Sequence, residues 1–86
     1  MPYTVSIKKR AEKYLEGIRD ARLYQRLSDA IGGLASIPRL PDCLKMQGGE
    51  DLYRVRVGDY RIVYEIQDAV LVVLVVQIGN RRKVYR

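Results

Sequence analysis

Two alternating segments separated by Gly58-Asp59 constrain the fold of this chain more than any other feature. In residues 52–57 and 60–67, apolar side chains recur at every second position, which is typical of β-strands with one buried face. A two-residue Gly-Asp loop between them predicts a tight β-hairpin. In the register that this loop sets, Val55 pairs with Ile62 on the core face. A slip of one residue would turn the polar positions into the core, so the register is well specified.

The same register predicts that three arginines, Arg54, Arg56 and Arg61, share the opposite face of the hairpin. Arg56 then lies directly across from Arg61, although like charges directly opposite on a sheet are unfavourable by about 0.2–1 kcal/mol. An anion held between the two arginines would remove this repulsion, and the forked guanidinium matches phosphate oxygens. One interpretation is therefore a phosphate-binding face. The other is a solvated strand face, with Glu65 as a structural partner of an arginine.

The rest of the chain predicts an α+β domain. Residues 3–7 alternate as a short strand, and two segments with apolar residues at helical spacing follow. Asp20 is placed to cap the second helix, and Pro38 to end it. Residues 70–78 are almost continuously apolar, as in a central strand covered on both faces. The predicted fold is an N-terminal strand, a two-helix hairpin and an antiparallel sheet of three to four strands, with both helices on one face.

Two connections complete this prediction. Residues 38–49 contain two prolines and two glycines and are expected to form a surface loop. Asp68-Ala69 is expected to form a second tight turn before the apolar strand.

Composition limits the chemistry that the chain can perform. The 86 residues predict one domain over residues 1–86. With no histidine and a single cysteine, Cys43, a zinc or iron–sulfur site is nearly excluded and a Ser-His-Asp or Cys-His site is excluded, so no metal or other cofactor is expected. Cys43 is expected to be a small buried hydrophobe, in a chain that fits the reducing cytoplasm. The net charge of +6 predicts a polyanionic partner.

The chain ends in a basic tail that follows the apolar strand after Gly79. Its cations are Arg81, Arg82, Lys83 and Arg86. Because a single glycine separates this tail from the strand, we expect it to stay at the sheet edge. Tyr85 either stacks on a nucleic-acid base or packs against the protein. A solubilising end is the plain alternative for the tail as a whole.

Four segments resemble the RelE/ParE superfamily of bacterial and archaeal toxins. They are LASIPR at 34–39, KMQG at 45–48, LYRVRVGDYRIVY at 52–64 and IGNRRKVY at 78–85. The closing Arg…Val-Tyr is similar to the RelE branch, whereas the gyrase-inhibiting ParE branch usually lacks it. The resemblance implies a microbial-ribonuclease-like fold and a metal-independent endoribonuclease that cleaves mRNA in the ribosomal A site. It also implies a type II toxin–antitoxin system, in which a cognate antitoxin binds the toxin in a hetero-oligomer.

The resemblance further implies roles for individual residues. The implied catalytic residues are Arg54, Arg56, Arg61, Arg81 and Tyr85, and the implied RNA-binding residues are Lys45, Arg82, Lys83 and Arg86. In such a reaction the 2′-hydroxyl attacks the adjacent phosphorus, and cations stabilise the charge that builds on the phosphoryl oxygens. Many relatives carry histidine where this chain has Asn80, so the general acid and base stay open. A ParE-like gyrase inhibitor without hydrolytic activity and a non-toxic basic binding module remain alternatives.

Overall fold

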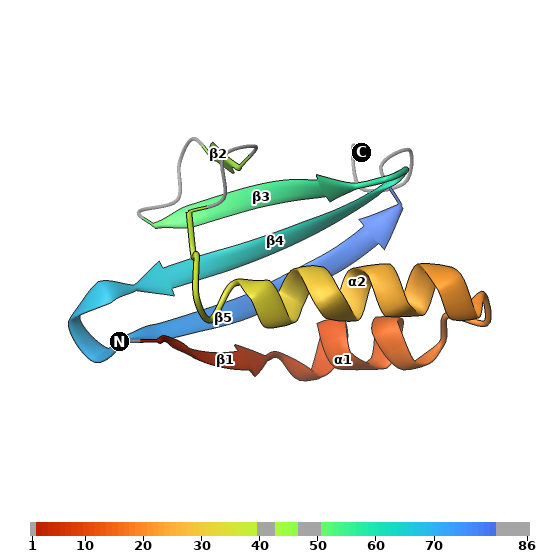
Figure 1. Cartoon of the computed structure of the whole chain (residues 1–86), viewed down its shortest axis with the longest axis horizontal. Coiled ribbons are helices and arrows are strands. Elements are labelled where there is room, and N and C mark those ends of the chain that lie inside the picture. Colours follow the sequence, from red (N-terminus) through yellow and green to blue (C-terminus); the bar gives the residue numbers. More distant parts are fainter. Residues whose placement is uncertain (1, 40–42, 47–50, 81–86) are drawn as a thin grey trace.

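The computed structural model describes residues 2–39, 43–46 and 51–80, which form two helices and a five-stranded sheet (Figure 1). The elements in chain order are β1 (Thr4–Ile7), α1 (Lys9–Glu16), α2 (Ala21–Gly33), β2 (Leu44–Lys45), β3 (Leu52–Val57), β4 (Tyr60–Gln67), the short 3₁₀ helix η1 (Asp68–Val70) and β5 (Val72–Asn80). The strand order is β1-β5-β4-β3-β2. This arrangement confirms the predicted α+β class.

The β3–β4 hairpin forms in the predicted register. Arg56 pairs with Arg61 and Val55 with Ile62 on either side of the two-residue loop. Gly58, the first loop residue, has a φ of 61°, which glycine adopts without strain. This conformation at the first loop position matches a type II′ turn, whose twist suits the flanking strands.

The sheet is mixed rather than purely antiparallel. β1 pairs with β5 in parallel, with Thr4 opposite Val72, while the other neighbouring strands are antiparallel. The alternation within residues 3–7 predicts a strand but carries no information on its direction. The direction of β1 depends on the path that the chain takes afterwards, through the two helices that directly follow this strand (Figure 1).

β5 lies between β1 and β4, but the expectation that both of its faces are covered is wrong. On the helix side Val73 and Val75 are fully buried, whereas on the other side Val72, Leu74 and Val76 are partly exposed. β5 also contains a bulge. Val63 of β4 pairs with Gln77 and Tyr64 pairs with Val75, so the pairing between the two strands passes over Val76.

Both helices pack on one face of the sheet and form a single core with it. The buried core residues are Ala11, Leu15, Leu27, Ile31 and Leu34 from the helical segment and Val55, Ile62, Tyr64, Ile66, Val73, Val75 and Ile78 from the strands. Cys43 is partly buried and packs against this cluster, as expected for a small hydrophobe. The described residues contain no helix that is long and apolar enough to cross a membrane.

The helix ends are set by local contacts. The Asp20 side chain accepts hydrogen bonds from the backbone N–H groups of Arg22 (3.0 Å) and Leu23 (3.2 Å), as expected for an N-cap. The expectation that Pro38 ends α2 is wrong, because the helix stops at Gly33 and continues as a turn. Consecutive glycines at this end weaken the helix before the proline is reached.

Both predicted connections differ in detail. The segment 38–49 contains the short edge strand β2, which pairs with Tyr53 and Arg54 of β3, so within its described residues it is not only a loop. The expected tight turn at Asp68-Ala69 is instead η1, followed by Leu71 with a φ of 55°. The Asp68 carboxylate at the start of this turn makes tertiary contacts, which are described below.

Candidate functional site

The sheet side that faces away from the helices is called the open face here, and β3, β4 and β5 supply its side chains. Cross-strand pairing arranges it in three rows: Arg56, Arg61 and Gly79; Arg54, Val63 and Gln77; and Leu52, Glu65 and Leu74. Neighbouring rows are two residues apart along a strand, or about 7 Å. The open face therefore passes from a cationic row to a largely apolar row that carries one carboxylate.

The three hairpin arginines share this face but differ in burial. Arg61, on the interior strand β4, is only 4% exposed, whereas Arg56 on β3 is exposed and Arg54 is half-buried. The partner of Arg61 on β5 is Gly79, which has no side chain to compete for space. The sheet thus holds one guanidinium in a defined place and presents a second one, across the hairpin, to solvent.

Among the arginines that the structure describes, none is the partner expected for Glu65. In the part of the chain that the structure describes, the salt bridge joins Arg39 and Asp68, and Glu65 forms no ion pair with an arginine. Glu65 stands opposite Leu52 on one side and Leu74 on the other.

Lys45 is not brought together with the arginines. It pairs with Tyr53, and directly paired residues of neighbouring strands project to the same side of a sheet. Tyr53 packs against the core, so Lys45 projects to the helix-covered side, where it is exposed.

The other predicted site residues follow Asn80, which ends β5 and pairs with Tyr60 beside the hairpin loop. Arg81, Arg82, Lys83, Tyr85 and Arg86 lie outside the described residues.

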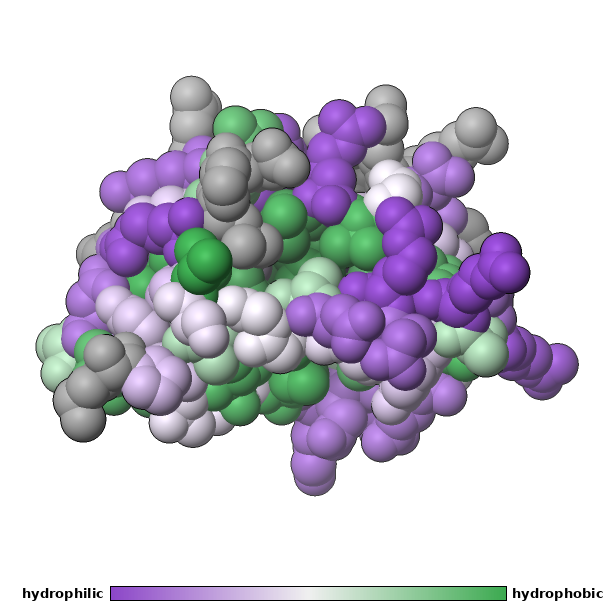
Figure 2. Space-filling view, viewed as in Figure 1, coloured by the Kyte–Doolittle hydropathy of each residue, from purple (hydrophilic) through white to green (hydrophobic). Residues whose placement is uncertain are grey.

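The hairpin end of the molecule is rich in hydrophilic residues, which Figure 2 shows at the right, over the start of α2 and the hairpin loop. Two adjoining hollows of about 470 and 440 Å³ lie between this loop and the connection of the helices. Their cationic lining residues are Lys13, Arg19, Arg22 and Arg26. Positive charge therefore also covers the helical side of this end.

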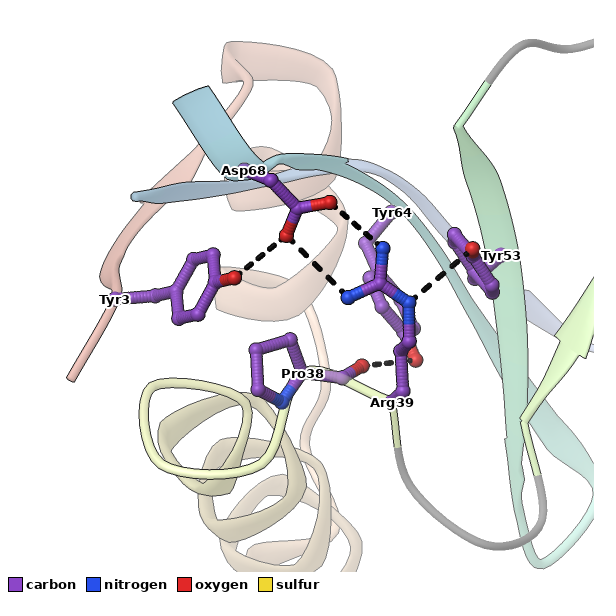
Figure 3. A network of polar contacts seen from close by, with 6 residues as sticks. All are labelled: Tyr3, Pro38, Arg39, Tyr53, Tyr64 and Asp68. Atoms are coloured by element: carbon purple, nitrogen blue, oxygen red, sulfur yellow. Dashed lines mark hydrogen bonds and ion pairs between the residues drawn. The ribbon is translucent and has the colours of Figure 1, made fainter. Parts of the chain in front are cut away.

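A second polar cluster, which the sequence did not predict, lies at the opposite end of the sheet (Figure 3). Arg39 binds Asp68 through two hydrogen bonds, Nη2 to Oδ2 at 2.8 Å and Nη1 to Oδ1 at 3.3 Å. The Tyr3 hydroxyl donates to the same carboxylate at 2.5 Å. The hydrogen bonds from Arg39 and Tyr3 hold the pKa of Asp68 below its usual value, while the bond to Asp68 raises the pKa of Tyr3.

This cluster is joined to two stacked tyrosines. The Arg39 guanidinium lies 5.4 Å from the ring centre of Tyr53, and that ring stacks on Tyr64 at 6.1 Å. The Tyr64 hydroxyl donates to the carbonyl oxygen of Pro38 at 2.9 Å, and burial raises the pKa of Tyr64. The cluster connects the residue before β1 and the segment after α2 with β3, β4 and η1, so its role is structural. No local sequence pattern predicts this cluster, because its members are far apart in the sequence.

A model of the family of ParE toxins of type II toxin–antitoxin systems, parDE, matches residues 5–85. The structure is also similar to that of the RelE chain in the archaeal RelE–RelB complex from Pyrococcus horikoshii, with 32% identity and a TM-score of 0.80 over 94% of this chain and 97% of that one. The chain belongs to the RelE/ParE toxin superfamily.

Two bacterial RelE/ParE structures agree with this assignment. The intact RelBE toxin–antitoxin complex of E. coli contains a chain with 25% identity and a TM-score of 0.78, covering 91% of this chain and 95% of that one. The RelBE2 complex of Mycobacterium tuberculosis contains one with 26% identity and a TM-score of 0.76, covering 94% and 100%. No curated protein sequence matches the chain. The family model thus carries the ParE name, whereas these solved structures are of RelBE systems.

Proposed function

We propose that this RelE/ParE toxin is a ribosome-dependent endoribonuclease that cleaves mRNA in the A site and so inhibits translation. The observation that carries the proposal is the pairing of Arg56 with Arg61 on the open face, with Arg54 in the next row. Such a pairing costs stability unless an anion lies between the two side chains. The scissile phosphate of an RNA strand is an anion of the right kind, because guanidinium groups match its oxygens.

In the proposed reaction, the O2′ atom of the nucleotide attacks the adjacent phosphorus as the bond from phosphorus to O5′ breaks. The products are a 2′,3′-cyclic phosphate and a 5′-hydroxyl, so one proton leaves O2′ and one is added to O5′. Arg61 and Arg56 bind the phosphoryl oxygens, on which negative charge builds. Arg54 contacts the phosphate or the 2′-oxygen. Arg61 suits this role because its burial keeps it in place before the substrate arrives.

Tail residues supply the remaining proposed roles. Arg81 acts at the leaving group or the phosphate, and Tyr85 positions the 2′-hydroxyl and stacks on a base. With no histidine in the chain, no side chain has an unperturbed pKa near neutrality, since the pKa of tyrosine is near 10 and that of arginine is higher still. We therefore assign much of the rate to positioning of the mRNA by the ribosome.

The proposal includes two kinds of partner. The first is a cognate antitoxin, because the similar chains of Pyrococcus horikoshii and E. coli were solved as complexes with RelB. The second is mRNA on the ribosome, with contacts to 16S ribosomal RNA, which places the toxin in the cytoplasm. Arg82, Lys83 and Arg86 are the proposed RNA-binding residues outside the catalytic set. Lys45 is not among them, because it projects to the helix-covered side of the sheet.

The test uses programmed ribosomes, the purified toxin and primer extension to map cuts in the mRNA. We expect cuts in the A-site codon and a loss of roughly 10²–10³ in rate for Arg56→Ala and Arg61→Ala, which is the usual effect of removing one such contact. Arg56 is exposed, so its variant keeps the test valid if the buried Arg61 proves necessary for folding. Arg10→Ala, an exposed arginine on α1, is the matched control. Intact mRNA at high toxin concentration would rule the proposal out.

The second candidate is a ParE-like inhibitor of DNA gyrase without hydrolytic activity, which the name of the matching family model favours. It predicts blocked supercoiling or stabilised cleavage complexes in a gyrase assay. It also predicts indifference to Tyr85→Phe. Gyrase inhibition together with intact mRNA would establish this candidate in place of the first.

A further inference from the structure

Tyr60, the first residue of β4, lies at the point where the strands that carry the site meet. Arg61 follows it directly in the chain, and on β3 it pairs with Val57, the residue after Arg56. On β5 it pairs with Asn80, after which the basic tail begins. The backbone around Tyr60 therefore connects the paired arginines with the start of the tail.

Tyr14 of α1 contacts this junction from the helical side. The ring centres of Tyr14 and Tyr60 are 6.5 Å apart, and the ring planes meet at 61° in an edge-to-face arrangement. This separation lies within the range of roughly 4.5–7 Å that is usual for aromatic pairs. The backbone N–H of Asn80 also donates to the Tyr14 hydroxyl. One side chain thus contacts both β4 and β5 where they approach the arginines.

The two ends of this contact are held differently from Tyr14 itself. Ala11 and Leu15 fix α1 in the core, and Tyr60 packs against the same core. Tyr14 is 39% exposed and lines the larger of the two hollows beside the hairpin loop. It therefore bridges a fixed helix and the end of the sheet without filling the core, so its removal should leave the core intact.

Tyr14 is not placed to take part in the chemistry directly. Burial, and then the neighbouring Tyr60, raises the pKa of Tyr14, so its hydroxyl is neutral at physiological pH. Tyr60 and Val57 project to the helix-covered side of the sheet, whereas Arg56 and Arg61 project to the open face. A side chain on the helix-covered side can influence a phosphate on the open face only through the residues that it holds.

We propose that Tyr14 is a positioning residue of the site, which holds Tyr60 and the end of β5 and thereby fixes Arg56, Arg61 and the start of the tail. The inference rests on the proposed function, because it takes mRNA cleavage as the reaction of these arginines. Electrostatic stabilisation of a transition state requires donors that are in place before the reaction begins. A displacement of about 1 Å is enough to lower a rate by about 10²-fold.

The first arm of the experiment measures cleavage at increasing concentrations of programmed ribosomes, with each rate expressed per folded toxin molecule. Tyr14→Ala should lower kcat about 10- to 100-fold with little change in KM, because the substrate still binds while the arginines are misplaced. Tyr14→Phe keeps the ring contact and should retain most of the rate. A purely structural role would reduce the amount of folded toxin and leave kcat per folded molecule unchanged.

The matched control is Tyr24→Ala. Tyr24 lies on α2 and is 41% exposed, close to the value for Tyr14. Within the described residues, the two aromatic pairs do not include it. Tyr24→Ala should therefore keep the wild-type kcat and KM.

The second arm needs no ribosome and measures backbone order parameters of the isolated toxin by NMR relaxation. Values of about 0.85 indicate a rigid backbone and values below about 0.6 a flexible one. Tyr14→Ala should lower the values at Arg61 and Asn80, whereas Tyr24→Ala should not. If Tyr14→Ala does not fold, Tyr14→Leu, which keeps an apolar side chain without a ring, takes its place in both arms.

The two arms separate this inference from the proposed function. Wild-type kcat in Tyr14→Ala would overturn the inference and leave the proposed function in place. A reduced kcat with unchanged order parameters would also overturn it, because Tyr14 would then act on the RNA itself. Lower order parameters in Tyr14→Ala, with no cleavage by wild type, would support the hold of Tyr14 on the sheet end and overturn the proposed function.

Discussion

At the scale of single residues, the proposed function makes a demand on Arg56 and Arg61 that opposes the stability of the hairpin. Their direct opposition on the hairpin is unfavourable in the absence of an anion. Conflicts of this kind are expected at functional sites, where activity is retained at some loss of stability.

The first prediction concerns Arg56→Thr. Threonine has a high strand propensity and removes the like charge, so the free energy of unfolding should rise by about 0.2–1 kcal/mol. Cleavage on programmed ribosomes should fall at the same time. Urea denaturation and primer extension measure the two effects. A variant that is both less stable and fully active would contradict the assignment of Arg56 to the phosphate.

The second prediction concerns the Asp68 carboxylate. Its pKa is below the usual value because Arg39 and then Tyr3 hydrogen-bond to its charged form. The ionised carboxylate therefore stabilises the folded state above the ordinary pKa of about 3.9, and this contribution is lost as pH falls through the lower pKa of the folded state. Wild type should be more stable than Asp68→Asn near pH 6, and the difference should shrink as the solution is acidified through this range.

Urea midpoints of the two proteins, measured from neutral to acidic pH, provide the check. Asp59→Asn is the control, because asparagine suits the same hairpin turn. A difference between wild type and Asp68→Asn that stays constant with pH would show that the Arg39–Asp68 ion pair contributes nothing through ionisation.

At the scale of elements, two glycines have opposite effects on the stability of the fold. Gly58 has a φ of 61° in the hairpin loop, a conformation in which a Cβ atom costs roughly 1–2 kcal/mol. Gly32 lies within α2, where a Cβ atom would meet nothing within 4 Å. Glycine inside a helix is less favourable than alanine by roughly 0.5–1 kcal/mol.

The third prediction follows from this contrast. Gly58→Ala should lower the free energy of unfolding by about 1–2 kcal/mol, since the added methyl group also lies 3.3 Å from Nη1 of Arg26, a flexible side chain that can move. Gly32→Ala should raise it by about 0.5–1 kcal/mol. Thermal or urea unfolding distinguishes the two, and a loss of stability in both variants would show that the α2 surface is packed more tightly than the geometry indicates.

At the scale of the whole molecule, the helix-covered face and the open face of the sheet differ in what they contain. The helices and one side of the sheet form the core, while the arginine rows and a hollow lined by Lys8, Leu52 and Glu65 occupy the other side. The net charge of +6 favours the approach of a polyanion at long range, and in the proposed function the placement of this charge determines which surface binds RNA.

The fourth prediction concerns the salt dependence of RNA binding. If the isolated toxin binds a single RNA strand through about four phosphates, the slope of log affinity against log salt should be near −3, at roughly −0.7 for each phosphate. Arg56→Ala should make the slope less negative by about 0.7, whereas Arg10→Ala on α1 should leave it unchanged. A slope that is insensitive to Arg56→Ala would place the RNA on another surface, such as the cationic hollows beside the hairpin loop.

Much of this architecture could be predicted from the sequence, because it depends on patterns that extend over only a few residues. The Gly58 loop, the strand alternation and the Asp20 cap act within a few residues, so the hairpin register and the start of α2 were predicted correctly. The shared face of the three arginines follows directly from that register. Position along a strand also predicts which side chain lies opposite which, but not how deeply each is buried.

Apart from the end of α2, which the consecutive Gly32 and Gly33 set locally, the main features that were missed join distant parts of the chain. The parallel pairing of Thr4 with Val72, the position of Lys45 across from Tyr53 and the Arg39–Asp68 ion pair each depend on the path of the chain between the partners. No local pattern encodes that path.

The sequence by itself determined the α+β class, the hairpin and the row of paired arginines, since alternation and turn chemistry are local properties. Only the tertiary structure decided that Arg61 is buried, that the open face of β5 is partly exposed, and that Lys8 and Glu65 line one hollow. These features arise because the sheet brings together strands from separate parts of the chain and so places their side chains next to one another. Burial likewise depends on neighbours that are distant in the sequence.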